Sequence, residues 1–183
     1  MKETKIKQST NENTMKTIKR TSIYLLGIVL MTAACSDDPP TPSEDEQIAA
    51  MLEEVRTTTA SFTDIGRAID AGWDTDLSGC VEHPAEGGMG HHYARLEWLD
   101  GRVNHLEPQV LLYVMGDDGE MEFLGLEYVV PFDFVGPDEA PPVLFFHEFH
   151  ANHDQGFWAL HVWTEKDNPK GMFYDWNPNV SCP

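Results

Sequence analysis

Three ionisable side chains lie inside apolar segments of this sequence: His92, Glu127 and His161. A buried carboxylate is costly unless it is paired, protonated or bound to a metal ion. Two imidazoles and one carboxylate form a ligand set that suits Fe(II), and with other geometry Zn or Mn. If the fold brings the three residues together, we expect a divalent metal ion there, either Fe, Zn, Mn or Cu. Without a metal ion, the same residues would form a buried hydrogen-bond network.

The alternation of side chains along a strand predicts that all three residues are buried. In segment 90–99, His92 shares its face with Ala94, Leu96 and Trp98, whereas His91 lies on the opposite face with Tyr93, Arg95 and Glu97. In segment 120–130, Glu127 shares its face with Phe123 and Val129, and the opposite face carries Leu124, Leu126, Tyr128 and Val130. In segment 157–165, His161 lies between Ala159 and Trp163. Alternation leaves open whether the three strands face one pocket.

The elements that must position these residues follow from hydrophobic spacing. Apolar residues recur at helical spacing across 45–72, which predicts two helices or one broken helix. Segments 90–99, 109–115, 120–130 and 157–165 have the composition of strands, and Gly116–Gly119 is typical of a hairpin turn. Helices followed by strands predict an α+β fold, with the helical segment packed on an antiparallel sheet. A partly closed β-barrel is the alternative.

Other histidines are weaker candidates. His83 lies in a loop near Cys80 and could supply a fourth metal ligand or a proton-transfer group. His147, His150 and His153 occur close together with Glu148 and Asp154. A loop could gather these residues around a second, exposed metal ion, although a solvated polar loop is the simpler interpretation.

The first 34 residues have the layout of a bacterial lipoprotein signal. Basic residues precede an apolar run from Ile23 to Ala34, and Cys35 follows small residues. The run of about 12 residues is shorter than the roughly 20 that span a bilayer. We therefore expect cleavage before Cys35, lipid on Cys35 and attachment to a membrane of the cell envelope outside the cytoplasm. Residues 35–46 are acidic and rich in proline and should form a tether, and residues 47–183 should form one domain.

Two further cysteines, Cys80 and Cys182, fit an exported protein. In an oxidising compartment they most simply form a disulfide, and a pair of metal ligands is the alternative interpretation.

The charge of the predicted mature chain excludes some partners. Residues 1–34 hold 6 Lys and Arg and 2 Asp and Glu, so residues 35–183 hold 6 basic and 29 acidic residues, a formal net charge of −23. Such a chain repels nucleic acid and anionic membrane surfaces, so membrane attachment would come from the lipid. The sequence also lacks a Gly-x-Ser-x-Gly elbow, a phosphate-binding Gly-x-x-x-x-Gly-Lys loop and a dinucleotide fingerprint.

Five motifs resemble those of a family of uncharacterised exported bacterial proteins and lipoproteins. They are GMGHHY at 88–93, LEYVV at 126–130, LHVW at 160–163, NPKGMF at 168–173 and WNPNVSC at 176–182. The resemblance spans about residues 57–182 and brings no named activity. It implies that six residues occupy the family's recurring positions: Cys80, His83, His92, Glu127, His161 and Cys182.

Three functions follow from these observations. The first is a lipid-anchored domain that binds a metal ion through His92, Glu127 and His161, with His83 as a candidate fourth ligand. The second is a metal-dependent enzyme acting on a small apolar substrate, in a pocket shaped by Tyr93, Tyr128 and Trp163. The third is a binding or structural lipoprotein without metal.

Overall fold

The computed structural model describes residues 41–183. The predicted signal and the lipidation site at Cys35 lie outside these described residues. Helix α1 spans Glu44–Thr59, a 3-10 turn η1 spans Ala60–Thr63, and helix α2 spans Ile65–Asp70. The prediction of a broken helix across 45–72 is therefore confirmed.

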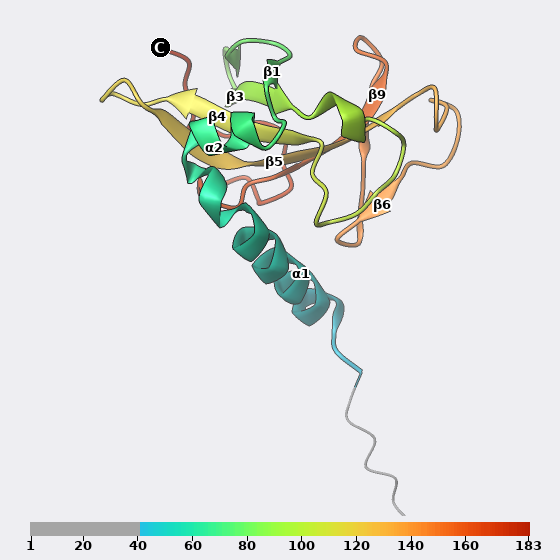
Figure 1. Cartoon of the computed structure of the whole chain (residues 1–183). Coiled ribbons are helices and arrows are strands. Elements are labelled where there is room, and N and C mark those ends of the chain that lie inside the picture. Colours follow the sequence, from blue (N-terminus) through green and yellow to red (C-terminus); the bar gives the residue numbers. More distant parts are fainter. Residues whose placement is uncertain (1–40) are drawn as a thin grey trace, which may run out of the picture. The chain divides into compact units, whose positions relative to one another are not determined.

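Helix α1 begins inside the predicted tether, before the predicted domain boundary at Gln47. Ser43 and Glu46 form a capping box, in which the Ser43 side chain accepts from the Glu46 backbone and Glu46 accepts from the Ser43 backbone. These bonds satisfy N–H groups that a helix start otherwise leaves unpaired. The N-terminal half of α1 projects away from the sheet (Figure 1), and its buried residues, Leu52, Val55 and Thr59, lie in the other half.

A seven-stranded antiparallel sheet forms the rest of the domain (Figure 1). Its strands are β1 (Thr75–Asp76), β2 (Val81–His83), β3 (Gly87–Ala94), β4 (Val110–Met115), β5 (Met121–Pro131), β8 (His150–Asn152) and β9 (Phe157–Val162). The strand order is β1-β3-β4-β5-β9-β8, and β2 pairs with the first half of β3. A separate hairpin joins β6 (Val143–Leu144) to β7 (His147–Glu148). Among the described residues the sheet does not close into a barrel, so the α+β prediction is confirmed.

The two faces of the sheet carry separate apolar clusters. The helices cover the larger cluster, in which Leu52 and Val55 of α1 pack with Leu126, Tyr128 and Val130 of β5 and with neighbouring strands. The opposite face carries Ala94, Val110, Leu112, Val114, Leu124, Val129 and Trp163. The final segment of the chain covers part of this face through Val180.

A β-bulge changes the predicted faces in the first part of β5. Leu112 pairs with Gly125 and Tyr113 pairs with Phe123, so Leu124 is the extra residue. An extra residue reverses the alternation of side chains on either side of it. Phe123 therefore packs in the helix-side cluster and Leu124 in the opposite one, the reverse of the prediction.

The predicted strand 90–99 is also shorter than expected. Strand β3 ends at Ala94, and a 3-10 turn η2 follows at Leu96–Trp98. Leu96 is 52% exposed, and Trp98 packs against the helix-side cluster, where its ring lies 5.1 Å from that of Trp73. The predicted shared face of His92, Leu96 and Trp98 is therefore wrong beyond Ala94, because the strand alternation stops there.

A disulfide joins Cys80 to Cys182 and ties the end of the chain to the sheet. The predicted pairing is confirmed, and the alternative of a Cys metal pair is wrong because both sulfur atoms are in the bond. Nearby, the Gly88 backbone bonds to Asn177 and Val180. A Cβ atom at Gly87 would overlap the Asn177 backbone, so glycine is needed for this approach.

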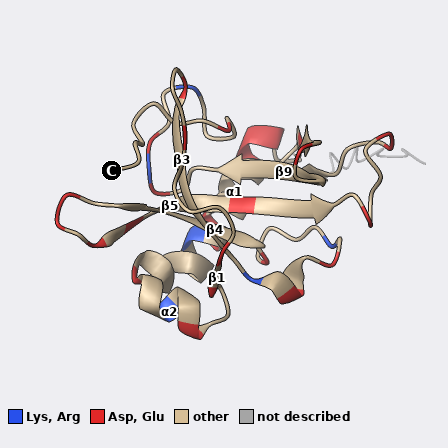
Figure 2. Ribbon diagram, turned by 90° about the horizontal axis from the view of Figure 1, so that it is seen from above, with Lys and Arg blue, Asp and Glu red and all other residues tan. Residues whose placement is uncertain are grey.

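Acidic residues are more frequent than basic ones along the helices, loops and turns (Figure 2). Among residues 41–183, no helix is both long and apolar enough to cross a membrane.

Candidate metal centre

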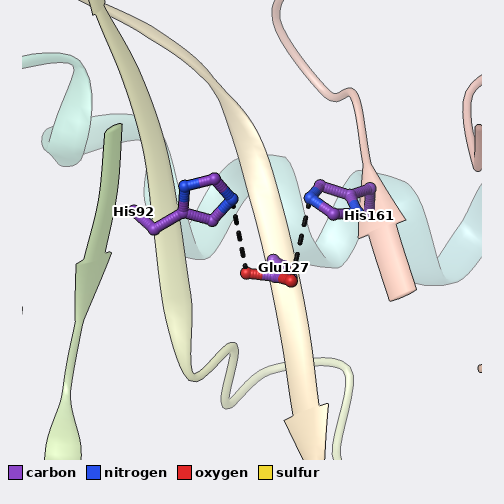
Figure 3. A group of neighbouring side chains, drawn as sticks. All are labelled: His92, Glu127 and His161. Atoms are coloured by element: carbon purple, nitrogen blue, oxygen red, sulfur yellow. Dashed lines mark ion pairs between the residues drawn. The ribbon is translucent and has the colours of Figure 1, made fainter. Parts of the chain in front are cut away.

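Three strands place His92, Glu127 and His161 on the sheet face that lies away from the helices. Glu127 of β5 pairs directly with His161 of β9. His92 of β3 lies across β4, where it pairs with Leu112. Figure 3 shows the Glu127 carboxylate between the two imidazoles. The sheet thus joins three residues that are distant in sequence.

The three side chains are within reach of a single ion. His92 Nε2 lies 3.8 Å from Glu127 Oε2, and His161 Nε2 lies 3.7 Å from Glu127 Oε1. One ligand atom from each residue lies within 4.8 Å of the others. Because metal bonds to histidine and carboxylate are about 2.0–2.2 Å long, ligand atoms that share an ion lie about 3–4 Å apart. Both His–Glu distances match this range. The residues are 8%, 4% and 3% exposed, respectively, so the predicted burial is confirmed.

Hydrogen bonds on the far side of each imidazole direct its Nε2 atom toward Glu127. His161 Nδ1 lies 3.2 Å from Asp175 Oδ1, and an ionised carboxylate can only accept, so Nδ1 carries the proton. His92 Nδ1 lies 3.1 Å from Ser78 Oγ. Since the Ser78 hydroxyl donates its single proton to the Gly79 carbonyl, Oγ accepts from His92 Nδ1. In the neutral form, both imidazoles therefore present an Nε2 lone pair to the centre.

This arrangement leaves a polar group without a partner. His161 Nε2 is buried and has no hydrogen-bond partner among the described residues. A buried unsatisfied nitrogen costs about 1–3 kcal/mol. The two Nε2 atoms and the carboxylate are all acceptors, so the centre lacks a positive charge. Either a proton or a metal ion supplies it.

The pKa shifts of His92, His161 and Asp175 indicate which imidazole binds a proton more readily in the metal-free site. Burial lowers the pKa of His92, although the Glu127 charge acts in the opposite direction. Burial also acts to lower the pKa of His161, but the Glu127 and Asp175 carboxylates outweigh it and raise that pKa. Burial acts to raise the pKa of Asp175, and the bond and charge of His161 outweigh it, so the pKa is lowered. The raised pKa of His161 thus favours a proton at the place that a metal ion would take.

The centre opens into a pocket of about 1020 Å³. His92, Glu127 and His161 line it, and so do the residues that hold the imidazoles, Ser78 and Asp175. Three protein ligands with a cavity beside them are typical of metal sites that keep a coordination position for water or substrate. A purely structural site would be closed by a fourth protein ligand.

Asp175 and Ser78 were not among the predicted site residues. Asp175 lies in the C-terminal segment, outside the regular elements, where hydrophobic alternation gives no orientation. Its carboxylate also bonds to His150 Nδ1, at 3.1 Å to Oδ2. His150 pairs with Ala159 of β9, which places it on the sheet face of His161. One carboxylate thus contacts a buried imidazole and an exposed one.

The remaining histidines do not join the centre. His83 is exposed, its ring lies 5.4 Å from that of Trp176, and it is not part of the three-residue group. The alternative of a second metal site around His147 is not formed among the described residues. The His147 ring packs against that of Phe173, with the ring centres 4.0 Å apart, while His150 bonds to Asp175. Among the described residues, His92, Glu127 and His161 are the only such group.

The predicted aromatic lining of the pocket is wrong. Tyr93 and Tyr128 pack in the helix-side cluster, because each directly follows a site residue on its strand and so points to the other face. Trp163 lies on the correct face but bonds to the Tyr174 carbonyl and does not line the pocket. Phe157 and Trp176 are the aromatic residues that do.

Comparisons with protein-family models, with curated proteins and with solved structures found no match to this chain.

Proposed function

We propose that this protein binds one divalent transition-metal ion through His92 Nε2, His161 Nε2 and the Glu127 carboxylate. The convergence of three buried acceptors, of which His161 Nε2 has no hydrogen-bond partner within residues 41–183, carries this proposal. A metal ion would neutralise Glu127 and satisfy both lone pairs at once. It would also displace the proton from His161.

The ligand types narrow the choice of metal. Two nitrogens and a carboxylate suit Fe(II), Zn and Mn, and imidazole also suits Cu. Calcium and magnesium prefer sites made of oxygen ligands. Cys80 and Cys182 form a disulfide, so neither can supply a thiolate ligand.

We further propose that the remaining coordination positions face the pocket, which favours a ligand-binding or catalytic role over simple storage. A metal ion with an open position can polarise a substrate or activate a water molecule. The pocket gives a small molecule access to such a position. A metal-dependent enzyme is therefore the second candidate function.

The location of the protein is proposed on separate grounds. The signal-like sequence before Cys35 supports export and lipid attachment, and the disulfide is compatible with a non-cytoplasmic location. The motif resemblance to exported bacterial proteins points the same way. The Cys35→Ser variant should lose lipid labelling and membrane association while keeping the metal site. A variant that stays in the membrane fraction would contradict the anchor.

Metal content of the exported chain tests the binding proposal. Glu127→Gln keeps the side-chain size but removes the charge, so we expect about one metal ion per chain in wild type and almost none in the variant. Glu122→Gln is the matched control. Glu122 lies on the same strand, but its side chain is exposed and forms an ion pair with Lys166. Unchanged metal content in Glu127→Gln would remove Glu127 from the ligand set.

A further inference from the structure

The pocket above the metal centre has two chemically different walls. Apolar side chains form one part of it, including Leu77, Val81, Met89, Leu99 and Phe157. The turn between β8 and β9 forms another, with Asn152, His153, Asp154 and Gln155. Leu77 is 48% exposed, so an apolar surface remains open at this place. The volume fits an ordinary small-molecule site of about 300–1,000 Å³.

The charge of the pocket selects among ligands. Among the described residues that line it there is no Lys or Arg, whereas Glu127, Asp154 and Asp175 are acidic. A bound divalent ion would not reverse this balance, because three carboxylates exceed its charge when the histidines are neutral. The surrounding domain is acidic as well (Figure 2). An anionic ligand would therefore meet a negative pocket and no fixed cation other than the metal ion.

We propose that this pocket binds a neutral or positively charged small organic molecule, with an apolar body and one uncharged polar group, a hydroxyl or a free amine, that reaches the metal ion. The apolar wall holds the body. The polar group binds the metal ion at a position that His92, Glu127 and His161 leave open toward the pocket. This inference rests on the proposed metal site for the polar contact, but the charge preference depends only on the pocket.

Three probes with the same aromatic ring test the charge preference: benzylamine, benzyl alcohol and benzoate. Binding is measured by calorimetry on the exported chain, first loaded with Zn and then metal-free. We expect the metal-free protein to bind benzylamine and benzyl alcohol, with benzoate at least about tenfold weaker because of charge repulsion. In the Zn-loaded protein the preference against benzoate should shrink, because the metal ion attracts the carboxylate.

A charge reversal at the rim supplies the matched control. Asp154→Lys should strengthen benzoate binding several-fold relative to benzylamine. Asp117→Lys introduces the same charge in the turn between β4 and β5, outside this pocket, and should leave the ratio unchanged.

The outcomes separate this inference from the metal proposal. Benzoate binding to the metal-free protein as tight as that of benzylamine, or no binding of any probe to either form, would overturn the inference. A chain that takes up no metal but still prefers benzylamine would overturn the metal proposal and leave the charge preference of the pocket standing.

Discussion

Asp175 Oδ1 lies 3.2 Å from His161 Nδ1 and thereby fixes the direction of the Nε2 atom, which lies 3.7 Å from Glu127 Oε1. A carboxylate behind a metal-binding histidine holds the ring and increases its basicity as a ligand. Asp175 is thus a positioning residue for the proposed metal centre.

Replacing Asp175 by Asn should weaken metal binding about 10- to 100-fold, the usual effect of losing such a partner. The side-chain size is kept, so the fold should persist, as circular dichroism would show. Competition with a chelator measures the affinity. Asp167→Asn is the control, because this exposed residue lies in the same segment and is not part of the centre. Equal affinities of the two variants would contradict the positioning role.

Stability of the metal-free protein should be greatest near pH 6.5, the ordinary pKa of histidine. The pKa of His161 is raised in the folded state, so its stabilising contribution is complete below pH 6.5 and is lost as the pH rises through the raised value. The pKa of His92 is lowered, so its contribution is present above pH 6.5 and is lost as the pH falls through the lowered value. Thermal unfolding in chelator measures this profile.

The variant His161→Gln provides the control for that profile. It should lose the decline on the alkaline side and keep the decline on the acidic side. Saturating Zn should remove the alkaline decline in wild type, because the metal ion replaces the proton. A melting temperature that rises steadily to about pH 8 in metal-free wild type would contradict the raised pKa of His161.

Loss of the disulfide should destabilise the domain by about 2–4 kcal/mol. Cys80 and Cys182 are separated by 102 positions, so the bond restricts a long loop of the unfolded chain. Denaturant unfolding of the Cys80→Ser/Cys182→Ser variant measures the loss. A reductant should shift the wild-type midpoint and not that of the variant. An unshifted wild-type midpoint would show that the bond does not contribute to stability.

The turn between β6 and β7 contains two aromatic residues with positive φ, Phe145 at 52° and Phe146 at 59°. Positive φ at both central residues is typical of a type I′ turn, which favours Asn and Gly. Phe146 is 49% exposed, so Phe146→Gly should stabilise the protein by about 1 kcal/mol through relief of backbone strain.

The neighbouring residue gives the opposite expectation. Phe145 is 1% exposed, and Phe145→Gly should destabilise by about 3–5 kcal/mol because the loss of packing exceeds any relief of strain. Denaturant unfolding measures both variants. Destabilisation by Phe146→Gly comparable with that of Phe145→Gly would argue against strain at this turn.

Much of the candidate metal centre could be predicted from the sequence, because His92, Glu127 and His161 each lie in a regular strand. Alternation gives the face of a residue without knowledge of the partner strands. The same rule failed at Phe123 and Leu124 because of the β-bulge in β5. The bulge arises from pairing with β4 and cannot be recognised from the hydrophobic alternation of β5 alone.

The supporting residues could not be predicted in the same way. Asp175 and Ser78 lie in segments without helix or strand, whose path depends on the Cys80–Cys182 bond and on packing against the sheet. His83, in contrast, was a predicted candidate because it lies near Cys80 in the sequence, but it is not part of the three-residue group.

X-ray absorption spectroscopy of the metal-loaded protein tests the central claim most directly. For a chain loaded with Zn or Fe(II), the proposed site predicts two imidazole nitrogens, oxygen from a carboxylate and no sulfur. His92→Ala and His161→Ala should each remove one imidazole or abolish binding, whereas His105→Ala, a residue paired with Glu54 at the surface, should leave the spectrum unchanged. A chain that retains no metal, or a spectrum with fewer than two imidazoles, would contradict the claim.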